Sequence, residues 1–286
     1  MSIRIQNVKS IIKIVYFFLF YVKQIRLIGK GQIVTKSQNQ AFGAKILLSY
    51  FPKSYKIFKI VKVEVCAFMT DELKDIIYAD LFRYTGNARR YKNIYACHLE
   101  ERRSSPEFSY ISVMRRTRYY ADQVKKYDGL RKKIYQLKFG VSNYRLDRLS
   151  RKYHFQIPYD TDIGKGFYLA HFGRVIIHPK SVIGHNVNVS TGVVIGTQFR
   201  GKRKGSPHIG NYVWIGANAV IVGNIRIGNN VLIAPGAYVN FDVPDGSIVI
   251  GNPGLIRRSP GATLNYINNT ILFDEYNVRS DGVKQW

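Results

Sequence analysis

An aliphatic residue returns every six positions between residues 163 and 243 of this chain. The position after it is often glycine, and a further small or aliphatic residue stands four positions after it. A period of six fits neither an α-helix, with 3.6 residues per turn, nor a simple strand, with a period of two. A fixed short period instead indicates a solenoid. The twelve aliphatic positions are Ile163, Leu169, Ile177, Ile183, Val189, Ile195, Ile209, Ile215, Ile221, Ile227, Ile233 and Val239.

Each six-residue unit supplies one short strand and one turn, and three units close a triangular coil. Twelve units therefore predict roughly four coils, which exceeds the minimum of about three repeats for a stable stack. We expect the aliphatic side chains to stack inside, and the glycines to lie where the backbone bends sharply. The repeat is expected to begin after Pro158 and to end near Val243-Pro244. Its two interruptions, before Ile177 and before Ile209, predict longer turns.

Helical patterns precede the repeat. Thr70 is a candidate N-cap for a first helix that ends at Gly86, and Ser105-Pro106-Glu107 predicts the start of a second. A third, strongly basic helix is expected over roughly Tyr127–Tyr153. The expected fold is thus mainly β, a solenoid preceded by a small α-helical domain. We expect a helical domain over 69–155, the solenoid over 156–258, and a tail over 259–286 that packs loosely or moves.

The composition narrows the range of partners. Hydrophobic residues make up 46% of the 286 positions, which is ample for a core. Cys66 and Cys97 form neither a disulfide framework nor a metal-ligand spacing, so we expect free thiols in the cytoplasm. The net charge of +26 indicates an anionic partner. No nucleic-acid-binding motif accompanies this charge, so we expect an anionic lipid or a phosphorylated small molecule.

Residues 1–68 differ from the rest of the chain, because they hold twelve Lys and Arg and one acid, Glu64. The apolar stretch Ile11–Val22 is shorter than the roughly 20 residues of a membrane span. One interpretation is a basic, aromatic anchor that gives peripheral membrane association. The other, which we favour, is that the segment is translated upstream sequence and the native chain starts at Met69.

The order of these parts resembles the serine acetyltransferase family of hexapeptide-repeat acyltransferases. The residues that carry the resemblance are Ile163-Gly164-Lys165-Gly166, Leu169-Ala170-His171, Gly223-Asn224-Ile225 and Gly251-Asn252-Pro253. The resemblance covers about 69–258 and implies a left-handed parallel β-helix, acetyl-CoA as co-substrate, and a homotrimer with active sites between subunits.

By this resemblance His171 is the catalytic base. Histidine suits the role because its pKa lies near neutral pH, so it can take a hydroxyl proton and release it again. The family's orienting aspartate aligns with Gln156, and Asp160 and Asp162 lie nearby. The chain has no cysteine in the repeat, so we expect direct transfer without an acetylated enzyme.

Several positions depart from the family pattern for L-serine. Ala170 replaces an aspartate, and Gly205-Ser206 replaces an Arg-His pair, with His208 two positions late. The family's C-terminal isoleucine is also absent, because the chain ends in Trp286. A free amino acid needs ion-pairing groups, so these losses favour a sugar hydroxyl of a surface polysaccharide or its precursor. The alternatives are serine O-acetyltransferase and a non-catalytic scaffold that binds a membrane or a partner.

Cations and small residues are candidates for contacts with acetyl-CoA. The segment 199–205 is expected to be a mobile loop, and its cations attract phosphate groups. Small side chains on late coils would let the pantetheine arm lie against backbone amides. The candidates are Arg200, Lys202, Arg203, Lys204, Arg257 and Arg258 for the phosphates, and Gly216, Ala217 and Ala234 for the arm.

A zinc site made by His171, His178 and His185 is a further possibility that we consider improbable. Zinc needs ligands that converge on one point. Residues seven apart on a coil of about eighteen residues fall on different faces. We therefore expect no metal, and His178 and His185 as turn residues.

Overall fold

The computed structural model describes residues 71–86 and 105–271, all within one compact unit, Met69–Trp286. The predicted anchor or upstream segment 1–68, the cap Thr70, both cysteines and Trp286 lie outside the described residues.

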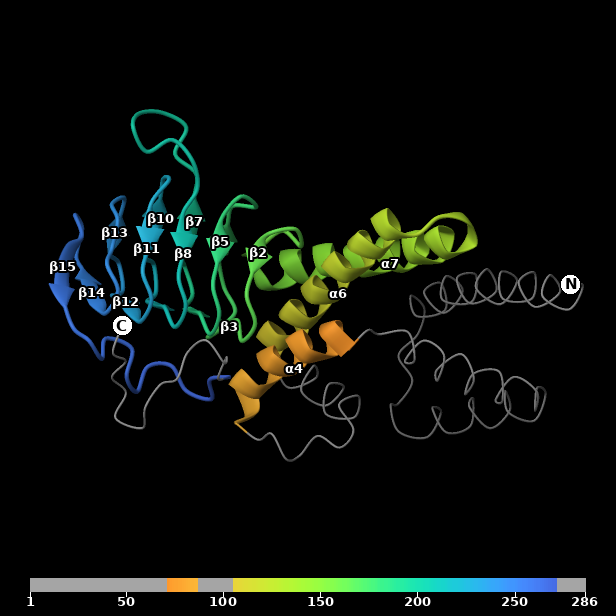
Figure 1. Ribbon diagram of the computed structural model, residues 1–286, viewed down its shortest axis with the longest axis horizontal. Helices are drawn as coiled ribbons and strands as arrows, with labels where there is room; N and C mark the ends of the chain where they lie inside the picture. The colour runs from red at the N-terminus through yellow and green to blue at the C-terminus, as the bar shows by residue number, and fades with distance from the viewer. Residues whose placement is uncertain (1–70, 87–104, 272–286) are drawn as a thin grey trace, which may run out of the picture. The chain divides into compact units, whose positions relative to one another are not determined.

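In the described residues before the solenoid there are three helices, as the sequence predicts: α4 (Asp71–Thr85), α6 (Pro106–Lys126) and α7 (Gly129–Tyr153). Gly86 adopts a φ of +64° directly after α4, and its N–H donates to the carbonyl of Phe82. The Ser105 hydroxyl accepts a hydrogen bond from the Phe108 N–H, which confirms Ser105 as the N-cap of α6. These helices lie at the end of the solenoid where its first coil begins (Figure 1).

The solenoid is a left-handed parallel β-helix of about five turns with three sheets as its faces (Figure 1). The first sheet contains β1 (Phe155–Gln156), β4 (Val175–Ile177), β7 (Val194–Gly196), β10 (Val220–Val222) and β13 (Tyr238–Val239). The second contains β2 (Asp162–Ile163), β5 (Val182–Ile183), β8 (His208–Ile209) and β11 (Arg226–Ile227). The third contains β3 (Tyr168–Leu169), β6 (Asn188–Val189), β9 (Trp214–Ile215), β12 (Val231–Ile233), β14 (Ser247–Ile250) and the antiparallel β15 (Leu255–Arg258). The strands run from Phe155 to Arg258, so they extend beyond the six-residue repeat at both ends, that is, before Pro158 and after Val243-Pro244.

The core confirms the six-residue pattern. All twelve aliphatic residues of the repeat are buried. Each stacks on its equivalents in neighbouring coils; in the first sheet the register aligns Ile177, Ile195, Ile221 and Val239. The repeat therefore forms three internal columns of aliphatic side chains, one behind each face.

The glycines after the aliphatic residues are needed for a reason other than the predicted one. Gly164, Gly184 and Gly210 do not have the positive φ of a sharp bend. A Cβ on Gly184 would instead lie 2.5 Å from the backbone oxygen of Gly210 in the next coil. The positive-φ residues stand two positions later in the turn, for example Gly166 and Asn186. Close approach between coils, more than chain bending, excludes a side chain at the first position.

Side chains from α4 and α6 form hydrogen bonds with backbone groups at the open edge of the first coil. The Tyr84 hydroxyl donates to the carbonyl of Leu169 and accepts from its N–H, and Tyr110 does the same at Ile157. Buried Arg115 donates to the carbonyl of Ile163 and forms an ion pair of 2.9 Å with Asp80. An exposed strand edge invites pairing with other chains, so these helices act as a cap on the solenoid.

The described part of the tail, residues 259–271, packs against the solenoid, where we expected loose packing or mobility. Residues 259–271 return along the solenoid as turns. Asn188 Nδ2 donates to the carbonyl of Tyr266, and the rings of Tyr266 and Trp214 lie 5.0 Å apart. Asn186 exchanges two hydrogen bonds with the backbone of Ile271.

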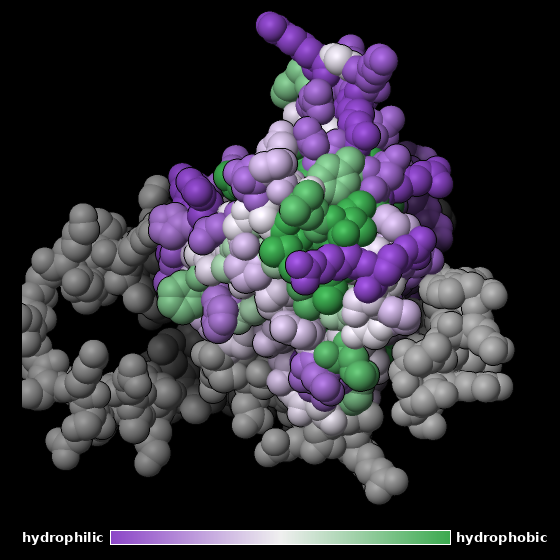
Figure 2. All heavy atoms as spheres, turned by 90° about the vertical axis from the view of Figure 1, so that its left-hand side faces the viewer, coloured by the Kyte–Doolittle hydropathy of each residue, from purple (hydrophilic) through white to green (hydrophobic). Residues whose placement is uncertain are grey.

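The far end of the solenoid has no helical cap within the described residues. Figure 2 shows this end, where hydrophobic residues gather within a polar surround. The exposed hydrophobic residues of β14 and β15 are Ile250, Leu255 and Ile256. Across residues 71–86 and 105–271, none of the helices combines the length and the apolar content that crossing a bilayer requires.

Candidate active site

The turns between faces form three edges along the solenoid. We call the turns from the third to the first sheet the His171 edge (170–174, 190–193, 216–219 and 234–237). The turns from the first to the second sheet are the loop edge (157–161, 178–181, 197–207, 223–225 and 240–242). The turns from the second to the third sheet are the asparagine edge (164–167, 184–187, 210–213, 228–230 and 244–246).

His171 is exposed in the longest turn of its edge. The end of α7 fixes this turn, because the N–H of Gly173 donates to the carbonyl of Tyr153. Gly173 has a φ of +139°, and a Cβ there would lie 2.4 Å from Thr191 Oγ1 in the coil above. Within the described residues the imidazole of His171 has no hydrogen bond or ion pair. The turn is thus fixed while its histidine points to solvent, which suits a base that meets an incoming molecule.

The two predicted partners of His171 lie in different places. Gln156 is exposed on β1, and its neighbour Phe155 pairs with Val175, the first residue after the His171 turn. Asp160 is exposed on the loop edge. The first sheet separates it from His171, a span of roughly 15–20 Å for five or six extended residues. The topology therefore brings Gln156 close to the His171 turn and keeps Asp160 away from it.

The small residues predicted for the pantetheine arm lie on the same edge as His171. Gly216, Ala217 and Ala234 belong to the last two turns of this edge, and the turn 190–193 lies between them and His171. The two alanines are partly exposed. The N–H groups of Gly216 and Ala234 already donate to the carbonyls of Ile233 and Val249. A bound arm would therefore pack against small side chains here, without hydrogen bonds from these two amides.

The loop 197–207 is a hydrogen-bonded hairpin, which differs from the mobile loop expected from its glycines. Gln198 and Gly205 exchange two backbone hydrogen bonds of 2.9 Å. Arg203 is held, because its guanidinium donates to the carbonyl of Asn240 and its carbonyl accepts from Asn224. Figure 1 shows the hairpin projecting between β7 and β8. Its exposed cations are Arg200, Lys202, Arg203 and Lys204, beside the exposed Phe199.

A polar contact at the base of this hairpin was missed from the sequence. The buried Ser206 hydroxyl lies 3.2 Å from His178 Nδ1 and also contacts Thr197 Oγ1. The N–H of Lys180 donates to the same Nδ1, so this nitrogen is an acceptor and Ser206 is the donor to it. Ser206 therefore anchors the hairpin to the preceding coil. The sequence indicates this only by placing Ser206 in the interruption of the repeat before Ile209.

Arg257 and Arg258 are exposed on β15, away from the His171 edge. Arg258 pairs with Ser247 at the asparagine-edge end of the β14–β15 hairpin, and its guanidinium donates to the carbonyl of Asp245. These two cations are the least well placed of the predicted phosphate contacts.

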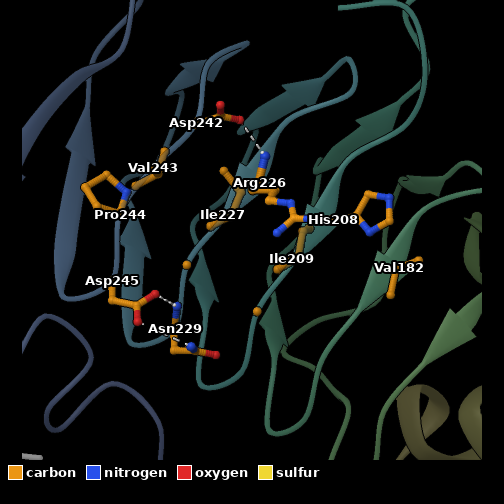
Figure 3. A pocket seen from close by; sticks show the side chains of 12 residues that line it. Val182, His208, Ile209, Arg226, Ile227, Asn229, Asp242, Val243, Pro244 and Asp245 are labelled. Atoms are coloured by element: carbon orange, nitrogen blue, oxygen red, sulfur yellow. Dashed lines mark hydrogen bonds between the residues drawn. The ribbon is translucent and has the colours of Figure 1, made fainter. Parts of the chain in front are cut away.

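A shallow groove of about 720 Å³ runs along the second sheet (Figure 3). His208 and Arg226 lie side by side on β8 and β11, and Asp242 accepts a hydrogen bond of 2.8 Å from the Arg226 N–H. The sequence contains the signal for this pair, because residues eighteen apart occupy equivalent places on neighbouring coils. The groove and His171 are on different parts of the same subunit.

The three histidines considered for zinc lie on three different edges. His178 is on the loop edge, and His185 is on the asparagine edge, where its Nδ1 accepts from the N–H of Lys165. The prediction that both are turn residues is confirmed.

The comparisons with known proteins agree with this fold. Residues 206–240 match the family described as bacterial transferase hexapeptide (six repeats). A serine acetyltransferase of Staphylococcus aureus is 35% identical over 130 residues, which are 45% of this chain and 61% of that protein. Serine acetyltransferase 4 of Arabidopsis thaliana is 40% identical over 124 residues, covering 42% of this chain and 35% of that protein. The chain thus spans less than two thirds of these relatives, and its predicted resemblance to serine acetyltransferases is confirmed over that part.

A solved serine acetyltransferase in complex with cysteine is similar in fold. Its TM-score is 0.50 at 21% identity, over 65% of this chain and 70% of that chain. At this identity the likeness concerns the β-helix and its helices alone.

Proposed function

We propose that this protein is an acetyl-CoA-dependent O-acetyltransferase in which His171 is the general base. The observation that carries the proposal is the His171 edge, where an exposed, backbone-anchored histidine stands below a column of small residues. The similarity to serine acetyltransferases of Staphylococcus aureus and Arabidopsis thaliana supports it.

In the proposed reaction, His171 takes the proton of the acceptor hydroxyl as its oxygen attacks the thioester carbonyl carbon. The tetrahedral intermediate then collapses, the C–S bond breaks, and the imidazolium returns its proton to the leaving thiolate of CoA. Gln156, close to the turn, is the candidate that orients the imidazole. The pantetheine arm packs along Ala217 and Ala234, and transfer is direct.

We propose L-serine as the first acceptor to test. The relatives favour it over the sugar hydroxyl that the sequence led us to expect, since those listed above are serine acetyltransferases. A saccharide stays the second candidate because Ala170 stands where the family's serine-specific members carry an aspartate, and Ser206 stands where they carry a histidine.

The proposed assembly is a homotrimer in the cytoplasm. Within one subunit the first sheet separates the cationic hairpin from His171. A neighbouring copy would supply Arg200, Lys202 and Lys204 to the phosphates of acetyl-CoA bound beside His171, as charge-assisted contacts. Arg257 and Arg258 keep a smaller role in this proposal because of their distance from the edge.

The test is CoA release from acetyl-CoA by the full chain, with L-serine as sole acceptor. We expect release that falls by about 10²–10⁴-fold in His171→Ala, the usual contribution of a general base. A thermal melt of the variant checks its folding. CoA release that occurs with saccharide acceptors but not with L-serine would identify a sugar hydroxyl as the acceptor. Equal release by His171→Ala and wild type would contradict the catalytic role and favour the non-catalytic scaffold.

A further inference from the structure

An apolar stripe runs along the exposed side of α7. Leu130, Ile134, Leu137, Val141 and Tyr144 succeed one another at spacings of four, three, four and three residues. On a helix of 3.6 residues per turn they fall within about 80° of the circumference. Their exposed fractions run from 47% for Ile134 to 61% for Val141.

The stripe is separate from the face that packs inside the protein. The buried residues of α7 are Tyr135, Ser142 and Leu146, which lie on another side of the helix, and Ser142 contacts Thr117 of α6. Isolated exposed apolar residues are ordinary, whereas a contiguous row along four turns of a helix marks a binding surface.

Cations border the stripe. Lys133 lies on one side of it and Arg145 on the other, both exposed, and Arg148 continues the stripe one turn beyond Tyr144. Helix α7 holds eight Lys and Arg against one acid, Asp147. The partner surface therefore has to be both apolar and anionic.

This charge argues against two occupants, a second copy of the chain and residues 1–68. A second copy packed stripe to stripe would bring the same cations together, which destabilises a helix pair. Residues 1–68 are apolar in part, but they too carry twelve cations and one acid. An anionic membrane surface combines an apolar interior with a negative surface potential.

We infer that α7 docks on an anionic lipid surface, with its apolar stripe in the acyl boundary and its flanking cations against the headgroups. This surface is separate from the proposed acetyl-transfer site, so the two can fail independently. Docking would hold the enzyme at a membrane where acceptors can be lipid-linked.

The experiment is flotation of the full chain with vesicles of phosphatidylcholine alone or of phosphatidylcholine mixed with phosphatidylglycerol. We expect the wild type to float with the mixed vesicles only. The stripe variant Leu137→Gln/Val141→Gln should bind at least tenfold more weakly. Lys133→Gln/Arg145→Gln should lose about fivefold per cation removed.

The matched control is Leu255→Gln/Leu264→Gln, which removes two leucines elsewhere that are at least as exposed on average as Leu137 and Val141, and it should float like the wild type. Circular dichroism verifies that each variant is folded. Three results would overturn the inference: no flotation of the wild type, equal flotation of the stripe variant, or a smaller assembly of the stripe variant in sedimentation. The last would mean that a second copy covers the stripe.

Discussion

Single atoms decide which positions of the repeat tolerate a side chain. Gly164, Gly184 and Gly210 stand in one column on the asparagine edge, and a Cβ on any of them would meet a backbone oxygen of the next coil. For Gly164 the gap is 2.6 Å and for Gly210 it is 2.7 Å. Backbone cannot move aside as a side chain can, so the coil spacing itself forbids the extra carbon.

Gly184→Ala should lower the free energy of unfolding by about 1–3 kcal/mol, the usual cost of overpacking a tight interior. Its matched control is Gly140→Ala on α7, where a Cβ meets nothing within 4 Å. That change should stabilise the protein by roughly 0.5–1 kcal/mol, because alanine favours the helix. Urea unfolding of both variants measures the difference. A Gly184→Ala protein as stable as the wild type would show that the coils separate easily.

At the scale of elements, the helices and the first coil depend on a buried ion pair. Burial raises the pKa of Asp80, while the charge of Arg115 and the N–H of Phe167 oppose the rise. The pair stays compatible with the interior because Arg115 also donates to the carbonyls of Ile163 and Gly164. The same guanidinium therefore neutralises a buried carboxylate and completes the strand edge.

Arg115→Met should cost about 3–5 kcal/mol, because it leaves a buried carboxylate without its cation. The pKa of Asp80 would then rise further above its unfolded value. The folded variant would bind a proton that the unfolded chain releases, so its stability should fall as pH rises from about 4 through that higher pKa. Urea unfolding at pH 5 and pH 7.5 should show the larger loss at pH 7.5. A pH-independent loss would contradict the assignment.

The strands and a helical cap on the solenoid could be predicted from the sequence, whereas the contacts that join the cap to the first coil could not. The burial of each aliphatic residue follows from a local pattern, because the spacing of six residues recurs nine times among the twelve positions. The contacts between the cap and the first coil join residues far apart in sequence, such as Asp80 and Phe167. No local sequence pattern predicts such contacts. His171 was predicted from its motif and from the interruption of the repeat that follows it. The anchoring of the hairpin by Ser206 depends on His178 of another coil, which no local pattern indicates.

Over the whole molecule, stability should vary along the solenoid. Middle coils are paired on both sides, the first coil is capped by helices, and the last is followed by the exposed strand β15. In stacked repeats each coil gains from its neighbours, so the coil with fewest neighbours opens first.

Amide hydrogen exchange tests this gradient. Strands β7 and β10 should exchange slowest, and β14 and β15 should exchange faster. Substituting Asn230→Ala, whose side chain accepts from the Thr263 N–H and hydroxyl, should release the tail and speed exchange over 260–271. Uniform exchange rates from β1 to β15 would argue that the solenoid opens as a single unit.

One column on the asparagine edge links every coil to the next by the same contact. The N–H of Lys165 donates to His185, that of His185 to Asn211, that of Asn211 to Asn229, and that of Asn229 to Asp245. Each coil thus accepts a hydrogen bond from the preceding coil and donates one to the following coil. These contacts alone would allow one coil more or one coil fewer. The tail limits that freedom, because residues 259–271 run back along the solenoid from β15 and bond to Asn186 and Asn188 of an early coil. A change in the number of coils would therefore require a tail of matching length.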